Sequence, residues 1–277
     1  MSRVIPAAEV LGPVIADLER VLDSLSDLAA RVADATPAGP ARRADLVALR
    51  PVIFGLLAAH RGLVAGAGVI TAPGLLADAA RCLEWWWTSP SGEPEPLRVN
   101  LDPRAPDFYD YTAAAWFRPT AEAGQRQVAG PYVDHACTGE YTLTLSTPVP
   151  HRDRPLGVAA ADVLVANLEP LVLPAMAGLG YPVALTGPDG RVIVSTSPSW
   201  PPGLRLPAAG RSGRGRFRPV TAVRRAGHGA PDPAGSAPDP EGPMPPFRSW
   251  LLVETEDAAA GPAGAGPLAR RRVRSRP

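Results

Sequence analysis

The chain of 277 residues contains no lysine, because all 28 of its basic residues are arginine. This absence excludes chemistry that depends on a lysine amine, such as a Walker-type phosphate loop or a Schiff base. Cysteine is also scarce, and two residues are too few for a disulfide-stapled secreted domain. No run of eighteen uncharged apolar residues occurs, and the N-terminus lacks a basic region followed by an apolar one. We therefore expect a soluble, cytoplasmic protein without membrane contacts.

Signatures of catalysis and of metal binding are missing as well. The four histidines form no H-E-x-x-H motif, the cysteines form no C-x-x-C motif, and no glycine-rich phosphate loop follows a predicted strand. His135 and Cys137 lie two residues apart, but neighbouring side chains on a turn seldom face each other, and no G-x-S-x-G motif accompanies them. We expect no enzymatic activity, no catalytic residues, no metal and no cofactor.

Proline (35 residues) and glycine (27) make a large part of the chain turn, loop or disorder. Residues 208–246 consist mainly of Gly, Pro, Ala and Arg, and we expect this insert to be disordered because it has little apolar surface to bury. The final residues 258–277 are predicted to be a disordered basic tail, with five arginines after position 269. Such a tail either contacts nucleic acid or an acidic partner or is simply solvated.

The apolar content of 45% is ample for a core, and the length suits one large or two small domains. Residues 8–35 are predicted to form a helix, because seven apolar residues recur at alternating spacings of three and four. This seam favours either a parallel two-stranded coiled coil, and hence a homodimer, or an amphipathic helix packed on its own domain. Its members are Leu11, Val14, Leu18, Val21, Leu25, Leu28 and Val32.

Residues 42–200 alternate between helical and strand-like patterns, which predicts an α+β fold. We expect helices over 44–60, 73–80 and 163–177, the last capped by Asp162. Strands are expected within 61–71 and 82–87, in a hairpin over 141–162, and in a second hairpin over 181–197 that turns at Pro188-Asp189-Gly190. Residues 247–257 are predicted to add a strand that returns to the sheet.

Aromatic residues make up only 6% of the chain, yet most of them fall between positions 85 and 141, interleaved with aspartates. Aromatic ring faces attract cations and carboxylates accept hydrogen bonds from ammonium groups, so this stretch is suited to bind an organic cation. The alternative is that the rings form a core and the acids are turn or cap residues. The aspartates are Asp102, Asp107, Asp110, Asp134 and, further along, Asp162.

The order FYDYTAAAWF, GPYVD, YTLTLSTPV and LGVAAADVLVANLE resembles the ligand-binding half of a Cache sensor domain, a PAS-like module of bacterial receptors. The resemblance covers roughly residues 60–200 and is greatest to the double-Cache type that binds amino acids and amines. It implies an antiparallel PAS-like sheet behind a long N-terminal helix, with the hairpin after Tyr181 as the start of a reduced second module.

The resemblance also implies a ligand cage in which aromatic rings and aspartates surround the ligand's ammonium group. In the family an arginine two residues before the tryptophan binds the ligand's α-carboxylate. This chain has Ala114 at that position, and it has phenylalanine where the family has the following tyrosine. The implied ligand-binding residues are Tyr109, Trp116, Phe117, Tyr132, Asp134 and Asp162.

The resemblance predicts a free-standing cytoplasmic sensor that binds a small amine and acts through its dimer state or through a separate regulatory or transcription protein. No kinase, cyclase or DNA-binding segment is recognisable in the sequence. The alternative is a dimeric scaffold of the same fold that binds no ligand and holds a regulatory partner.

Overall fold

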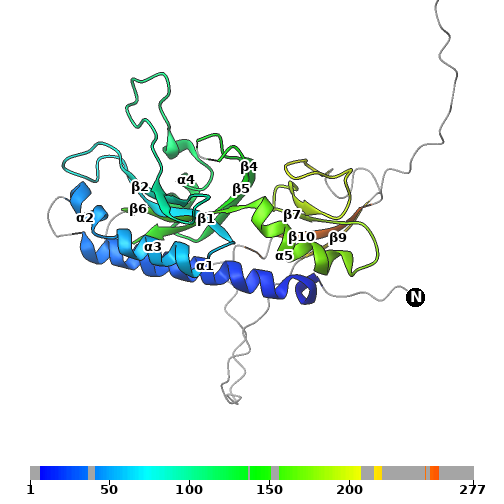
Figure 1. Ribbon diagram of the computed structural model, residues 1–277. Helices are drawn as coiled ribbons and strands as arrows, with labels where there is room; N and C mark the ends of the chain where they lie inside the picture. The colour runs from blue at the N-terminus through cyan, green and yellow to red at the C-terminus, as the bar shows by residue number, and fades with distance from the viewer. Residues whose placement is uncertain are drawn as a thin grey trace, which may run out of the picture.

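The computed structural model describes residues 7–36, 41–136, 138–150, 156–206, 215–219, 247 and 250–255 (Figure 1). Their strands form two antiparallel sheets, with helices packed mainly on one side. This arrangement confirms the predicted α+β class and the long N-terminal helix. In the described part of the chain, no helix combines the length and the apolar character that crossing a membrane requires.

The first sheet has six strands in the order β3-β2-β1-β6-β5-β4. Because successive side chains on a strand point to opposite faces, each strand serves two layers. On β6, Ala161 and Val163 join the large core beneath the sheet, whereas Ala160 and Asp162 face the other side, which we call the pocket face. The six strands are β1 (Val64–Thr71), β2 (Leu83–Thr88), β3 (Pro94–Pro96), β4 (Gln127–Val133), β5 (Tyr141–Val149) and β6 (Gly157–Leu164).

Helix α1 (Ala7–Ala35) packs along the face of the sheet opposite the pocket face (Figure 1). It contacts β5, β6, α3 (Arg50–Ala59) and α5 (Val165–Ala177). All seven residues of the predicted seam are at most 8% exposed within a single chain. The coiled-coil prediction is therefore wrong: the seam packs against the chain's own sheet and helices, which leaves little of it exposed to a second copy. The other interpretation, an amphipathic helix packed on its own domain, describes α1.

The second sheet has four strands in the order β8-β7-β10-β9. Strands β7 (Val183–Thr186) and β8 (Val192–Ser195) form a hairpin that turns at Pro188-Asp189-Gly190, and β10 (Leu251–Thr255) pairs with β7. Strand β9 (Gly215–Pro219) lies within the insert predicted to be disordered, so that prediction is wrong for these five residues. The rest of residues 208–246 and the predicted basic tail 258–277 lie outside the described residues. Strand β10 ends at Thr255, within the strand region predicted over 247–257.

Three local predictions differ from the structure. The helix expected over 44–60 is two helices, α2 (Arg43–Val47) and α3 (Arg50–Ala59), because Pro51 fits in a first helical turn but would remove a hydrogen bond inside a continuous helix. Residues 73–80 form turns rather than a helix. Asp162 does not cap α5 (Val165–Ala177), because it lies within β6 and the N-cap is Leu164.

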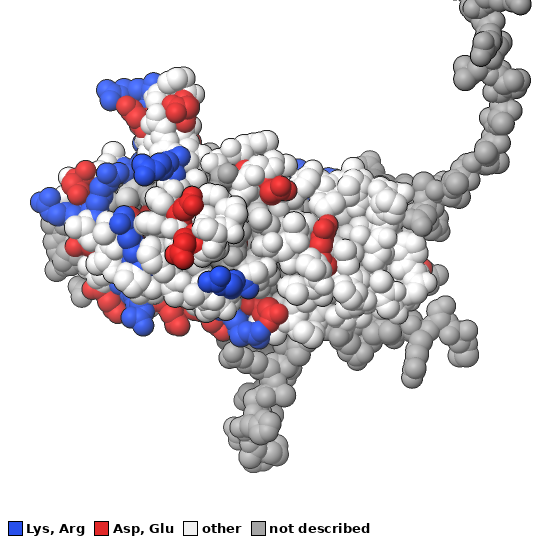
Figure 2. Space-filling model, in the orientation of Figure 1, with Lys and Arg blue, Asp and Glu red and all other residues white. Residues whose placement is uncertain are grey.

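Charged side chains are mixed in sign on the face of the molecule shown in Figure 2. Arginine and acidic residues are interspersed over the part that contains the first sheet, while the part around the second sheet carries few charges on this face (Figure 2). This face therefore offers no extended basic surface of the kind that binds nucleic acid.

Candidate ligand-binding site

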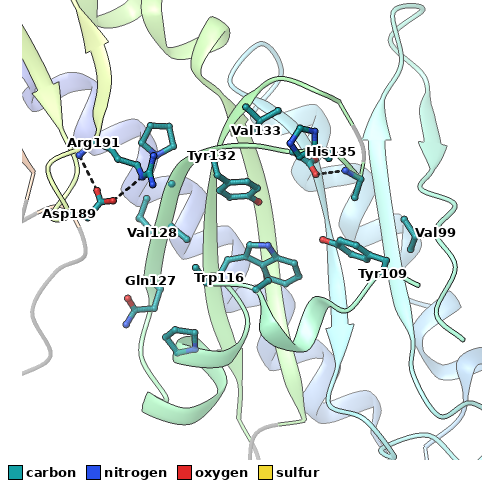
Figure 3. Close-up of a pocket in the computed structure, with 18 of the residues that line it drawn as sticks. Val99, Tyr109, Trp116, Gln127, Val128, Tyr132, Val133, His135, Asp189 and Arg191 are labelled. Atoms are coloured by element: carbon teal, nitrogen blue, oxygen red, sulfur yellow. Dashed lines mark hydrogen bonds and ion pairs between the residues drawn. The ribbon is translucent and has the colours of Figure 1, made fainter. Parts of the chain in front are cut away.

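A cavity of about 900 Å³ lies over the pocket face of the first sheet. Three segments enclose it: the loop that contains Tyr109, the segment around Trp116, and the end of β4 with Tyr132 (Figure 3). The β7–β8 hairpin of the second sheet forms a further wall through Asp189 and Arg191 (Figure 3). The volume lies within the range of small-molecule sites.

A second, inner cavity of about 20 Å³ lies deeper, against β2, β5 and β6. This volume accommodates about one water-sized group. Its lining includes Leu83, Trp85, Leu97, Thr144 and Asp162, none of which lines the outer cavity. Five residues line both cavities and form the junction between them: Tyr109, Trp116, Tyr132, Asp134 and Ala136.

The structure brings five of the six predicted ligand-binding residues together around this junction. Tyr109, Trp116, Tyr132 and Asp134 line both cavities, and Asp162 lines the inner one. Phe117 lines neither, because it packs behind the site.

Phe117 belongs to the core that supports the site. It is 5% exposed and makes edge contacts with Trp116 and Tyr111, at ring-centroid distances of 6.0 and 5.0 Å. Tyr111 donates a hydrogen bond of 2.9 Å from its hydroxyl to the carbonyl of Thr71 and thereby fixes η1 (Tyr111–Ala113) to the end of β1. These contacts position Trp116 over the cavity without adding Phe117 to its wall.

Two hydrogen bonds link Tyr132, Thr144 and Asp162 across neighbouring strands. Thr144 and Asp162 are register partners on β5 and β6, and the Thr144 hydroxyl donates to Oδ1 of Asp162 at 2.6 Å. The Tyr132 hydroxyl lies 2.6 Å from Oγ1 of Thr144, whose own proton goes to Asp162, so Tyr132 is the donor of this second bond. Burial raises the pKa of Tyr132, and the nearby carboxyls of Asp162 and Asp134 add to the effect.

Asp162 is 8% exposed, and burial raises its pKa to about 7. The hydrogen bond from Thr144 opposes this rise in pKa, and the negative charge of Asp134 adds to it. Asp134 lies at the end of β4, where its Oδ1 accepts a hydrogen bond of 3.1 Å from the backbone N–H of Ala136. Two buried carboxyls thus face one small cavity without an arginine between them in its lining.

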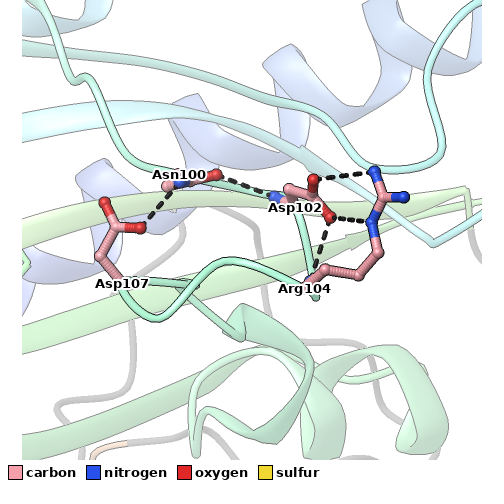
Figure 4. Close-up of polar contacts among 4 residues, drawn as sticks. All are labelled: Asn100, Asp102, Arg104 and Asp107. Atoms are coloured by element: carbon pink, nitrogen blue, oxygen red, sulfur yellow. Dashed lines mark hydrogen bonds and ion pairs between the residues drawn. The ribbon is translucent and has the colours of Figure 1, made fainter.

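The other aspartates of the aromatic stretch have local roles. Asp102 accepts hydrogen bonds from the backbone and guanidinium of Arg104, and Asp107 accepts one of 2.8 Å from the Asn100 amide (Figure 4). Asp110 caps η1 by accepting from the backbone N–H of Thr112. The interpretation as turn and cap residues therefore holds for these three, although Asp107 also lines the outer cavity.

Ala114 lines the outer cavity. The Cache domains that the sequence resembles have a carboxylate-binding arginine at this position. Two other arginines, Arg98 and Arg191, line the same cavity. The Arg191 guanidinium is held by Asp189 and by the carbonyl of Gly203, each at 3.1 Å. Arg205 also bonds to Asp189, so one carboxylate is shared by two guanidinium groups.

Thr144 and Trp85 belong to the inner cavity but are not among the predicted ligand-binding residues. The alternating pattern of TLTLSTPV could have indicated Thr144, because it places polar residues on one face of a strand whose apolar face is in the core. No comparable signal separates Trp85 from Trp86 and Trp87. Among the described residues, no group of three or more His, Cys, Asp and Glu side chains is placed to hold a metal ion.

No protein-family model matches the sequence. The structure is similar to a protein described as methyl-accepting chemotaxis protein X, with a TM-score of 0.60 and 15% identity over 90% of this chain and 94% of that chain. It is also similar to the ligand-binding domain of the Pseudomonas fluorescens chemoreceptor CtaA in complex with L-serine, with a TM-score of 0.52 and 15% identity over 90% and 92% of the two chains.

A third similar structure is the ligand-binding domain of the Pseudomonas aeruginosa PAO1 amino acid chemoreceptor PctC in complex with GABA. Its TM-score is 0.51, with 18% identity over 90% of this chain and 97% of that chain. At these identities the likeness concerns the fold. The chain has the Cache-like α+β fold of chemoreceptor ligand-binding domains.

Proposed function

We propose that this protein is a small-molecule sensor domain that binds a small amine at the junction of the two cavities. One observation carries the proposal: aromatic and acidic residues up to 53 positions apart in the sequence, Tyr109 to Asp162, line one connected site. The chemoreceptor domains of similar fold, whose complexes hold L-serine and GABA, support a ligand that carries an ammonium group.

The chemistry of the site favours a cation. Asp134 and Asp162 supply hydrogen-bond acceptors, while the rings of Trp116 and Tyr109 supply faces that attract positive charge. The negative charge of Asp134 contributes to the raised pKa of Asp162, and a bound ammonium group relieves that repulsion.

A screen by thermal shift tests this proposal directly. Primary amines at millimolar concentration should raise the melting temperature of the wild-type protein, because a ligand that binds the folded state stabilises it. Asp162→Asn should abolish the shift. Asp102→Asn is the matched control, because it removes an exposed carboxylate of the loop outside both cavities.

The screen can also reject the proposal. If no amine stabilises the wild type, the chain is a scaffold that binds no such ligand. If Asp162→Asn and Asp102→Asn respond like the wild type, the amine binds elsewhere on the protein.

A further inference from the structure

Trp85 carries a buried polar group without a partner. The residue is 6% exposed, lines the inner cavity, and its indole Nε1 has no hydrogen-bond acceptor among the described residues. The adjacent Trp86, on the opposite face of β2, is different: its Nε1 donates to Glu84 at 2.7 Å. A buried N–H group that lacks an acceptor has lost its hydrogen bonds to water without replacing them, which destabilises the folded protein. A ligand atom that accepts a hydrogen bond from Trp85 would therefore be favoured in the inner cavity.

The strand register places this donor close to Asp162. Gly68 pairs with Trp85 on one side of β1, and Gly66 pairs with Asp162 on the other, so all four positions share the pocket face. The indole leans over Gly66, where an added Cβ atom would lie 2.8 Å from Nε1. Glycine at position 66 thus leaves room for the Trp85 N–H beside the strand position that carries Asp162.

A hydroxyl group can satisfy both side chains, whereas an ammonium group cannot. An ammonium group donates hydrogen bonds but accepts none, so it can bond to Asp162 and would leave Trp85 unsatisfied. A hydroxyl oxygen accepts from Trp85 and donates to Asp162. A ligand carboxylate is excluded by its size, since the cavity of about 20 Å³ holds one water-sized group, and by the negative charge of two aspartates.

We propose that the ligand is a 1,2-amino alcohol whose hydroxyl group enters the inner cavity, accepts a hydrogen bond from Trp85 and donates one to Asp162. Its ammonium group then lies at the junction, beside Asp134 and the rings of Tyr109 and Trp116. This inference rests on the proposed amine site and adds the chemical class of the ligand. It assigns Trp85 as a specificity-determining residue.

Calorimetry with two ligands of equal size tests the inference. Ethanolamine and propylamine differ only by a hydroxyl in place of a methyl group. The wild type should bind ethanolamine at least about tenfold more tightly, which corresponds to about 1.4 kcal/mol. Trp85→Phe keeps an aromatic ring but removes the donor, so it should reduce the preference to within about twofold, mainly by weakening ethanolamine binding. Trp86→Phe, on the opposite face of the same strand, should keep the full preference.

The possible results distinguish a failure of this inference from a failure of the proposed amine site. If the wild type binds both amines equally, or if the preference survives in Trp85→Phe, the inference is wrong and the amine site stands. Equal binding of the two amines is also the result expected if a water molecule fills the inner cavity. If neither amine binds, both the inference and the amine site are wrong.

A measurement on the wild type covers the case in which Trp85→Phe does not fold. In a nitrogen-15 spectrum of the six tryptophan indole groups, ethanolamine should move one N–H resonance downfield, because that N–H gains an acceptor. Propylamine should not produce this shift. The absence of such a shift with ethanolamine would overturn the inference.

Discussion

The Thr144 hydroxyl donates a 2.6 Å hydrogen bond to the buried carboxyl of Asp162, its register partner on the neighbouring strand. The bond fixes the orientation of the carboxyl toward the inner cavity. It lowers the pKa of Asp162, but burial has the larger effect and keeps that pKa at about 7. Asp162 therefore changes its protonation state in the neutral pH range, and two predictions depend on this property.

Amine affinity should rise with pH between 6 and 8. The negative charge of ionised Asp162 attracts an ammonium group at the junction, and with a pKa of about 7 the ionised fraction grows from about one tenth to about nine tenths over this interval. We expect about a tenfold gain in affinity by calorimetry, with release of a proton on binding at pH 6. Asp162→Asn should flatten the profile and, at pH 8, weaken binding by roughly 2–5 kcal/mol. A flat wild-type profile would show that the charge of Asp162 does not contribute to binding of the ammonium group.

The stability of the ligand-free protein should change with pH in the opposite sense. The folded pKa of Asp162, about 7, exceeds the value of about 3.9 in an unfolded chain, so the folded state binds more protons between pH 4 and 7. Stability contributed by the neutral carboxyl is present below pH 4 and is lost as pH rises toward 7, by at most about 4 kcal/mol. Urea unfolding should show that Asp162→Asn is more stable than the wild type at pH 8. Equal stability of the two proteins at pH 8 would contradict a raised pKa.

Ligands with an α-carboxylate should bind more weakly than the corresponding amines. Ala114 offers no cation to the carboxylate, and the Arg191 guanidinium is already held by Asp189 and Gly203. Arg98 lines the outer cavity but not the inner one, so it is not among the residues at the junction where the ammonium group binds. A carboxylate would therefore enter a site with two aspartates and no dedicated partner, and we expect at least about a tenfold loss of affinity by calorimetry. Ala114→Arg should reduce this difference. Equal affinities for an amine and its α-carboxylated analogue would show that another residue binds the carboxylate.

Truncation within the apolar seam of α1 should destabilise the monomer fold itself. Leu18 and Leu25 are fully buried against the chain's own core, so replacing either by alanine leaves a cavity and should cost about 2–5 kcal/mol. Urea midpoints should be independent of protein concentration in the wild type and in both variants. A midpoint that rises with concentration would instead indicate that association between chains contributes to stability.

The sequence was sufficient for the secondary structure wherever one periodicity ran uninterrupted. The spacing of three and four predicted α1, and the alternation in TLTLSTPV predicted β5, because each pattern follows from the geometry of a single element. The same spacing could not identify what covers the seam, since a partner helix and a sheet both accept an apolar stripe. Only the tertiary structure decided that question, by packing α1 on β5 and β6.

For the site, the sequence supplied the candidates and the fold selected among them. The order of motifs that resembles a Cache domain was enough to name five residues of the candidate site: Tyr109, Trp116, Tyr132, Asp134 and Asp162. Phe117 precedes a short helix and packs against Trp116 and Tyr111 instead of lining either cavity. Thr144 and Trp85 line the inner cavity because of strand register and the direction in which each side chain leaves its strand. These properties are set by pairing between strands distant in sequence, as between Gly66 and Asp162, and no local pattern contains them.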